Sequence, residues 1–432
     1  MLVFSIPVHA DCEADLKSWL AQEKKIAVIK LLENISPPDA LPGVVIAART
    51  RKEPNYYYHW VRDAGLVIEA ALETYAGSDD QALRSSIRAK VAQYATISSR
   101  LQNVETLTGL GEPKFNVDGT AYNEPWGRPQ DDGPAIRASS LIAYATILLH
   151  EGDFKAARVL YNHDFSSPIK RDLEYTAKNW RQPNFDLWEE VLGDHFFTRM
   201  VQRRALREGA HLALALGDSG AARFYNEQAQ LIEASLAEFY DAKTASWMTT
   251  LRRTAGLDYK ASNVDSAIVL GLIHGLRPGE MIRVNDDLIL SWSSASIRAS
   301  VDKVAAAFKD IYSVNQNPQA PGIAIGRYPE DRYSGNSTEG GNPWPLTTLS
   351  MAQALYENAV AERENGEVAR AEALIQAGDL YVARVQFHAF GDGSLSEQID
   401  HKDGHMTSVS DLTWNYAAIL TTEAARRRAA KN

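Results

Sequence analysis

The chain has 432 residues, of which 45% are hydrophobic and 23% are charged, a composition typical of a folded globular protein and not of a disordered one. Its formal net charge is −10 and it has no dense block of Lys and Arg, so we expect no nucleic-acid partner. No apolar run reaches the roughly 18 residues of a membrane helix, and the single cysteine, Cys12, excludes an intrachain disulfide and a Cys-rich metal site.

The first ten residues, MLVFSIPVHA, are mostly apolar and end in Val8-His9-Ala10, which is similar to the end of a signal peptide. They lack a basic segment before the apolar run, and that run is short. The sequence therefore favours neither export nor retention in the cytoplasm. We interpret residues 1–12 as a targeting remnant or an N-terminal tail.

Helical patterns dominate the rest of the chain, and convincing alternating strands are nearly absent. Stretches rich in Ala, Leu, Glu, Arg and Gln carry apolar residues at every third or fourth position. The predicted helices are Asp15–Glu33, Ala64–Tyr75, Asp80–Leu101, Ala135–His150, Phe154–Asn179, Phe196–Leu216, Gly220–Tyr240, Leu346–Glu364, Glu367–His388 and Ser410–Arg428.

The segments between these helices are dense in Trp, Tyr, Asn, Pro, Gly and acidic residues. One acidic residue from each serves as a marker: Asp63, Asp132, Glu189, Asp265, Asp331 and Glu397. The gaps between them are 69, 57, 76, 66 and 66 residues, so each interval holds about two helices. The sequence shows no repeat of fixed period, which an open solenoid would show. We therefore expect an all-α, closed double ring of about twelve or thirteen helices and one domain over residues 1–432.

Two glutamates stand out as candidates for acid and base chemistry. Cleavage of an acetal needs a proton donor and a second carboxylate. Glu189 lies in Asp186-Leu187-Trp188-Glu189-Glu190, where crowding and an apolar neighbour would raise a carboxyl pKa. Glu397 lies in a Gly-rich turn between hydroxyl side chains that would keep it ionised. Taken alone, the first segment could equally complement a helix dipole and the second could be a helix cap.

An aromatic cluster next to an Arg-Asp pair is typical of sugar recognition. The segment from Tyr56 to Asp63 supplies rings for sugar C–H faces and charged forks for hydroxyl pairs. A buried aromatic anchor with a structural ion pair is the alternative interpretation. The stretches 126–133 and 326–331 repeat the same theme of ring, Arg and acid, and Trp344 and Trp414 add further rings.

Long segments of the chain resemble the signature regions of the glucoamylases, glycoside hydrolase family 15. The resemblance covers nearly the whole chain, from about Leu16 to Arg428, and the motifs occur in the family's order. The segments are YYYHWVRDAGLV, GLGEPKFNVDGTAYNEPWGRPQDDGPAIRA, FDLWEEVLGDHFFT, AIGRYPEDRY, GNPWPLTTLSMAQALY, SLSEQID and SDLTWNYAAIL. This resemblance implies an (α/α)6 barrel and an inverting exo-hydrolase that releases β-D-glucose from non-reducing ends of α-1,4-glucans.

The resemblance also implies roles for individual residues. Glu189 matches the family's general acid and Glu397 its general base. The expected substrate-binding residues are Tyr56, Trp60, Arg62, Asp63, Trp126, Leu187, Trp188, Glu190, Arg327, Asp331, Gln398 and Trp414. The resemblance implies an α-glucan or maltooligosaccharide substrate and no metal or organic cofactor, and we expect a monomer.

One departure from the family pattern leaves the substrate preference open. Residues 334–341 form a longer link than usual, which affects the expected rim of the pocket. The alternatives are an exo-glucosidase for α-1,6-glucans or trehalose on the same fold, and a non-catalytic glycan-binding toroid.

Overall fold

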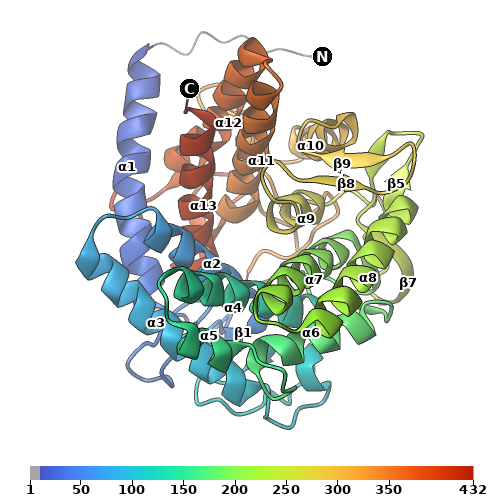
Figure 1. Cartoon of the computed structure of the whole chain (residues 1–432). Coiled ribbons are helices and arrows are strands. Elements are labelled where there is room, and N and C mark those ends of the chain that lie inside the picture. Colours follow the sequence, from blue (N-terminus) through green and yellow to red (C-terminus); the bar gives the residue numbers. More distant parts are fainter. Residues whose placement is uncertain (1–9, 336, 432) are drawn as a thin grey trace.

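The structure, a computed structural model, describes residues 10–335 and 337–431 (Figure 1). The proposed targeting remnant or tail therefore lies mostly outside the described residues. Within them the chain forms thirteen α-helices, and none of these is long and apolar enough to cross a membrane.

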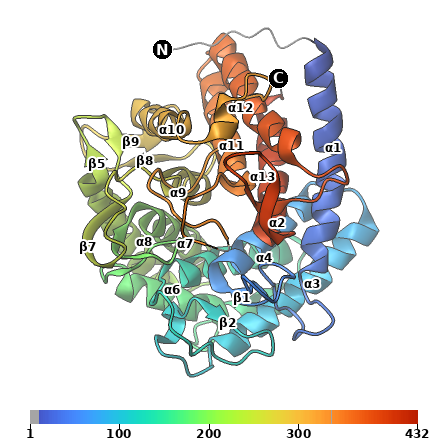
Figure 2. The same ribbon diagram turned by 180° about the vertical axis from the view of Figure 1, so that it is seen from behind.

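Six of these helices form an inner ring. Each packs against the next, and the last returns to pack against the first, so the ring is closed. The colours of Figure 1 follow this path around the ring, and Figure 2 shows the same closure from behind. The inner helices are α2 (Val61–Ala76), α4 (Asp132–His150), α7 (Phe196–Ala215), α9 (Ala267–Gly275), α11 (Pro345–Glu364) and α13 (Thr413–Ala429).

The remaining helices pack outside the inner ring, each against the inner helix that precedes or follows it in the chain, except that α1 packs chiefly on α13. They are α1 (Ala10–Glu33), α3 (Gln81–Leu101), α5 (Phe154–Leu160), α6 (Pro168–Asn179), α8 (Ser219–Ser235), α10 (Ala295–Phe308) and α12 (Val368–His388). Six inner helices surrounded by outer ones confirm the predicted (α/α)6 barrel.

One predicted helix was wrong, and two helices were missed. The single helix expected over Phe154–Asn179 is two helices, because Pro168 begins α6 as its first residue, where its missing N–H costs nothing. Helices α9 and α10 were not predicted. Helix α9 is apolar on nearly all sides because it is enclosed in the ring, so it shows no amphipathic period.

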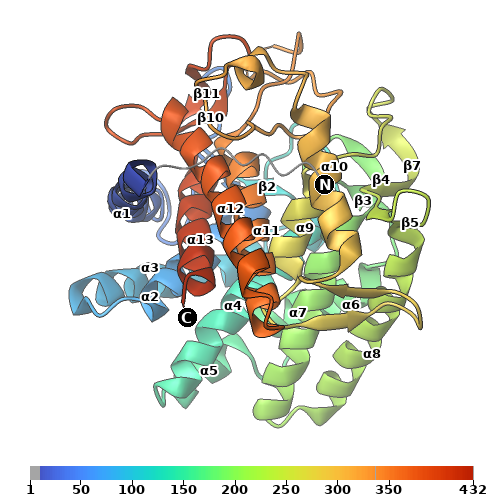
Figure 3. The same ribbon diagram turned by 90° about the horizontal axis from the view of Figure 1, so that it is seen from above.

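Short antiparallel strands, which the sequence did not indicate, lie within the segments that connect the helices. They are β1 (His59–Trp60), β2 (Lys114–Phe115), β3 (Asn184–Phe185), β4 (Val191–His195), β5 (Tyr240–Asp241), β6 (Ser246–Trp247), β7 (Thr250–Gly256), β8 (Met281–Arg283), β9 (Ile289–Ser291), β10 (Ser396–Ile399) and β11 (Met406–Ser410). The sheets β3-β4-β7 and β10-β11 lie toward the same end of the barrel, uppermost in Figure 3. That end carries the N-termini of the inner helices and the chemically rich loops.

The outer helix α1 buries one carboxyl group without a partner. Glu23 is 1% exposed, and neither of its side-chain oxygens has a hydrogen-bond partner among the described residues. It faces the turn at Gly393, where an added Cβ would lie 2.6 Å from Glu23 Oε2. Burial, and then the charge of Asp392, raise the pKa of Glu23 from 4.5 to about 7.

This raised pKa predicts that the free energy of unfolding depends on pH. Since the folded state binds the Glu23 proton more tightly than the unfolded state, its stabilising effect is complete below about pH 4.5 and is lost as the pH rises through about 7. We expect Glu23→Gln to match the wild type at pH 4 and to exceed it in stability at pH 8. Urea unfolding at both pH values tests this, with the half-exposed Glu33→Gln on the same helix as control. Equal stabilities of Glu23→Gln and the wild type at pH 8 would contradict it.

Candidate active site

A pocket of about 560 Å³ lies where the inner helices begin. It contains both expected catalytic glutamates, Glu189 and Glu397, and ten of the twelve expected substrate-binding residues. Those ten are Tyr56, Trp60, Arg62, Asp63, Trp126, Leu187, Trp188, Glu190, Arg327 and Trp414. Side chains from loops that are far apart in the sequence thus meet in one place, as the ring interpretation required.

The two remaining expected residues lie behind the wall of the pocket. Asp331 makes a two-point ion pair with Arg327, at 2.8 Å to Nε and 2.6 Å to the terminal nitrogen. Gln398 is fully buried and donates to Glu397 Oε2 at 3.0 Å, while it accepts from Asn342 at 3.0 Å. Both side chains hold a pocket residue in position, and their expected contact with substrate stays a prediction.

Glu189 occupies a strained backbone position. Its φ is +69°, a left-handed conformation that costs a residue with a Cβ free energy. Its Oε1 accepts hydrogen bonds from Trp60 Nε1 at 2.8 Å and Gln130 Nε2 at 3.1 Å, and lies 3.5 Å from Arg62. All these donors reach Oε1, so the other oxygen, Oε2, has no hydrogen-bond partner among the described residues.

Gly127 allows this loop to pack. A Cβ at Gly127 would lie 2.3 Å from the carbonyl oxygen of Glu189, a distance that no side chain tolerates without moving the backbone. The glycine therefore lets the loop of Trp126 approach the loop of Glu189 closely.

A buried ion-pair cluster fixes the Glu189 loop from beneath. Asp186 accepts from the backbone N–H of Glu190 at 2.7 Å and of Val191 at 3.0 Å. Lys260, which is 2% exposed, bridges Asp186 at 3.0 Å and Asp265 at 2.6 Å. Burial would raise the pKa of Asp186, but the charges of Lys260 and His195 and its hydrogen bonds outweigh burial and lower that pKa to about 2.

Asp265 extends this cluster to the wall of the pocket. Its Oδ1 accepts from Trp188 Nε1 at 2.9 Å, so the same cluster orients an aromatic ring beside Glu189.

Glu397 also lines the pocket and lies at an irregularity in the pairing of β10 with β11. Its side chain is 1% exposed. Ser408 and Gln398 both donate to Oε2. Burial raises the pKa of Glu397, whereas hydrogen bonds from Ser408, Tyr56 and Gln398 and the charge of Arg327 oppose that rise.

Two buried guanidinium groups lie in the pocket. Arg62 contacts Asp132 at 2.9 Å and Asp63 at 3.6 Å. Burial raises the pKa of Asp63 to about 7 against the lowering effect of Arg62, and the charge of Glu189 adds to the rise.

Arg327, the second guanidinium group, contacts Glu190 at 2.8 Å in addition to Asp331. Tyr328 donates to the other oxygen of Glu190 at 2.8 Å. Both guanidinium groups are therefore held by carboxylates beside the space that a ligand would fill.

Lys114 is a pocket residue that the sequence analysis missed. Its ammonium group is enclosed by four rings, with Trp126 nearest at 3.2 Å to the ring centroid and Tyr122 next at 4.0 Å. Burial lowers its pKa to about 8, although the charge of Glu189 acts in the opposite direction. The signal that could have identified it is its place in the GEPKF motif. In the structure, Lys114 on β2 pairs directly with Trp60 on β1.

Several other pocket residues were also not among the expected ones. They are Ala47, Pro54, Asn55, Tyr58, Tyr122, Gly127, Tyr333, Trp344 and Leu412. Of the longer link at 334–341, the described residues do not line the pocket, although Tyr333 just before it does and shares a hydrogen bond of 2.8 Å with Tyr56. The expected effect of the link on the rim of the pocket stays a prediction.

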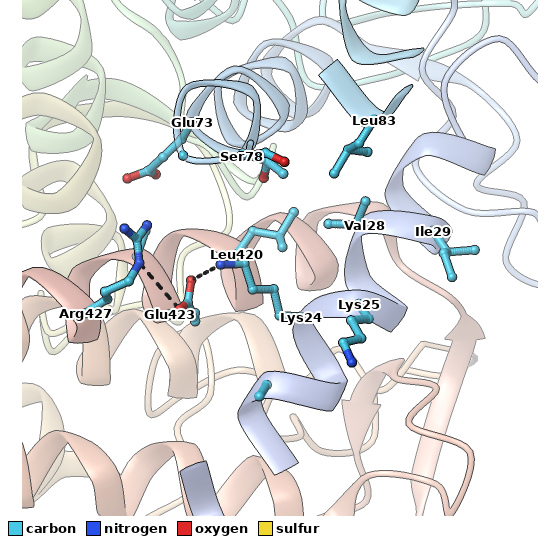
Figure 4. Close-up of a pocket in the computed structure, with 14 residues that line it drawn as sticks. Lys24, Lys25, Val28, Ile29, Glu73, Ser78, Leu83, Leu420, Glu423 and Arg427 are labelled. Carbon is cyan, nitrogen blue, oxygen red and sulfur yellow. Dashed lines mark hydrogen bonds and ion pairs between the residues drawn. The ribbon is translucent and has the colours of Figure 1, made fainter. Parts of the chain in front are cut away.

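A second pocket of about 550 Å³ lies between α1, α2 and α13. Figure 4 shows Glu423 between Lys24 and Arg427, with apolar side chains such as Val28 and Leu420 nearby. None of the described residues that line it is aromatic, so it lacks the rings that favour the first pocket as a sugar site. The described residues also contain no His, Cys, Asp and Glu group suited to a metal ion.

The Lys260 cluster generates a prediction about stability. Lys260→Met removes the charge that compensates two buried carboxylates, and breaking a buried pair from one side costs about 3–5 kcal/mol. We expect the free energy of unfolding, measured by urea titration, to fall by about that amount. The exposed Lys243→Met should change it by less than about 0.5 kcal/mol. Equal losses in the two variants would disprove the supporting role of Lys260.

Comparisons with known proteins identify the family. A family model described as Glycosyl hydrolases family 15 matches residues 26–424. A glucoamylase of Blastobotrys adeninivorans is 34% identical over 96% of this chain and 73% of its own length, and a probable glucoamylase of Schizosaccharomyces pombe is 32% identical over 94% and 91%. The solved glucoamylase of Saccharomycopsis fibuligera matches with a TM-score of 0.84 at 28% identity and covers 96% of both chains. The chain therefore belongs to the glycosyl hydrolases of family 15.

Proposed function

We propose that Glu189 and Glu397 carry out inverting hydrolysis of the terminal α-1,4-linked glucose at the non-reducing ends of starch-type or glycogen-type glucans and maltooligosaccharides. The product is β-D-glucose. This is the glucoamylase activity of the relatives that match nearly the whole chain. The single observation that carries the assignment of the two residues is that both line one pocket, together with two guanidinium groups and a set of rings.

Glu189 is the proposed general acid. Its proton goes to the glycosidic oxygen as the bond from that oxygen to the anomeric carbon breaks. Because the described donors hold Oε1, the free Oε2 is the atom suited to carry and deliver this proton. The nearby Arg62 then compensates the carboxylate charge that remains after the transfer.

Glu397 is the proposed general base. Water attacks the anomeric carbon from the opposite face and gives a proton to this carboxylate, so the anomeric configuration inverts. Burial raises the pKa of Glu397 and makes it a stronger base, while Ser408 and Gln398 hold one of its oxygens in place. No metal ion enters this proposal.

The charged pairs of the pocket suit the hydroxyl groups of one glucose unit. Arg62 with Asp63, and Arg327 with Glu190, each offer donors and an acceptor side by side, the arrangement that vicinal hydroxyls require. Trp126 is 38% exposed at the mouth and offers a ring for the next sugar. Because the pocket encloses one terminal glucose unit, we expect it to admit only the end of a glucan chain.

Two alternatives are less well supported. The relatives found are named as glucoamylases, which does not favour an α-1,6-glucosidase or a trehalase. A non-catalytic toroid would not need two carboxyl groups with different hydrogen-bond partners in one pocket.

We also propose that the chain is a monomer with a single domain, and light scattering should give a mass near 47.7 kDa.

Replacement of either glutamate tests the mechanism. We expect Glu189→Gln and Glu397→Gln each to lower kcat on maltooligosaccharides by about 10²–10⁴-fold, because each removes one proton transfer. Thermal unfolding midpoints should confirm that both variants fold. Glu124→Gln, an exposed carboxylate in the loop of Trp126, is the matched control. Activity within about tenfold of the wild type, equal to about 1.4 kcal/mol, would overturn the assignment.

The product anomer tests the stereochemistry separately. Inversion requires the two carboxyl groups to stand about 6.5–9.5 Å apart, with room for a water molecule between Glu397 and the sugar. We expect proton NMR in the first minutes of maltotriose hydrolysis to show β-glucose ahead of its equilibrium fraction. Early release of α-glucose would mean a retaining mechanism.

Relative turnover of three disaccharides tests the substrate. We expect kcat/KM for maltose to exceed the values for isomaltose and trehalose by at least about tenfold, a difference of about 1.4 kcal/mol in transition-state binding. A preference for isomaltose or trehalose would refute the α-1,4 assignment and leave the roles of the two glutamates intact.

A further inference from the structure

Four aromatic rings of the catalytic pocket form a closed cage around the ammonium group of Lys114. Each ring contacts the next edge to face, an arrangement that aromatic pairs prefer. The distances between successive ring centroids are 5.8, 6.2, 5.9 and 5.2 Å around the circle Tyr58, Trp60, Trp126, Tyr122 and back to Tyr58. We call these four rings the lysine cage.

The ring faces are the contacts that this ammonium group makes. Its Nζ lies 3.2 Å from the ring centroid of Trp126 and 4.7 Å from that of Tyr58, the most distant of the four. Among the described residues it has no hydrogen-bond acceptor and no ion pair. Ring faces attract a cation, but an ammonium group that is 1% exposed and lacks an acceptor is still costly to bury. A charge kept at this cost indicates a role other than stability.

Trp60 connects the lysine cage to Glu189. It pairs directly with Lys114 across β1 and β2, and its ring centroid lies 4.4 Å from the ammonium group. Its indole Nε1 donates to Glu189 Oε1 at 2.8 Å. A rotation of the indole ring would move this N–H away from the carboxyl group. The force that fixes the ring of Trp60 therefore also fixes the orientation of Glu189.

Arg128 holds the backbone on the other side of the cage. Its two terminal nitrogens donate to the carbonyl oxygens of Tyr122 and Glu124, both at 3.0 Å, and its Nε lies 2.9 Å from the buried carboxylate of Glu112. These bonds anchor the loop of Trp126 without Lys114. Loss of the ammonium charge should thus affect the rings and leave the backbone of the loop in place.

We propose that Lys114 is a positioning residue for Glu189. Its ammonium group holds the ring of Trp60 in the lysine cage, and the held indole N–H keeps Glu189 Oε1 in place, so that Oε2 stays free to carry the proton. Lys114 acts through Trp60 and not on the substrate itself. This inference rests on the proposed function, in which Glu189 is the general acid.

Hydrogen exchange of the indole N–H measures the hold on Trp60 without any hydrolysis. We would label the tryptophans of the full chain with nitrogen-15, and Trp60→Phe and Trp188→Phe each remove one signal and so identify the two that are needed. In Lys114→Met we expect the Trp60 indole to exchange at least about tenfold faster, because its ring is no longer held. The Trp188 indole, which donates to Asp265, should exchange at an unchanged rate.

Activity and stability should respond differently to the same substitution. We expect Lys114→Met to lower kcat on maltotriose at least about tenfold, since a small misplacement of a reacting group costs rate. The free energy of unfolding in urea should stay equal or rise, because a desolvated charge is removed. Lys52→Met, at an exposed lysine shortly before the pocket residue Pro54, is the matched control and should change neither quantity.

A double-mutant cycle tests whether Lys114 acts through Trp60. Trp60→Phe keeps a ring in the cage and removes the N–H that reaches Glu189. If this N–H carries the effect of Lys114, the double variant should have a kcat within about threefold of that of Trp60→Phe alone. Losses that multiply would mean that Lys114 acts directly on the substrate or on Glu189, and would overturn the proposal.

Three further outcomes would also overturn it. An unchanged exchange rate of the Trp60 indole in Lys114→Met would mean that the ammonium group does not hold the ring. Faster exchange with an unchanged kcat would mean that the orientation of the ring does not matter for hydrolysis. A fall in stability that accompanies the loss of activity would mean that Lys114 supports the fold in general. If the wild type hydrolysed no maltotriose, the proposed function would fail, and the exchange rates would still show whether Lys114 holds Trp60.

Discussion

Closure of the inner ring, through the packing of α13 on α2, is the constraint on which the rest of the structure depends. It directs six helix N-termini toward one end, each with unpaired N–H groups and the positive end of a helix dipole. Arg62 and Asp63 lie in the first turn of α2, and Trp414 lies in that of α13. Acidic side chains gather there because the local field compensates part of the cost of burying them.

Rigid support beneath the pocket is the second consequence of this arrangement. Asp186 holds the Glu189 loop by accepting hydrogen bonds from its backbone. Lys260 pairs with both Asp186 and Asp265, and Asp265 lies just before the start of α9. The left-handed conformation of Glu189 is maintained by this surrounding structure. The fold thus places Glu189, in a strained backbone conformation, on the short loop between β3 and β4.

The sequence was sufficient to predict the ring and most of the pocket. The near-even spacing of the acidic marker residues indicates the ring, and the long loop motifs indicate the pocket. It could not reveal α9, whose uniformly apolar surface has no period to detect. It also could not reveal that Asp331 and Gln398 lie behind the pocket wall, since a motif does not tell which side chain faces inward. Lys114 was overlooked because a lone lysine carries no pattern until the four rings around it are assembled.

The contact between Trp414 and His274 extends the support of the pocket wall into the helix ring. Trp414 lines the catalytic pocket, and its ring lies 6.3 Å from that of His274 on α9, a residue outside the described lining of that pocket. A substitution of His274 therefore acts on the pocket indirectly, through the position of the Trp414 ring.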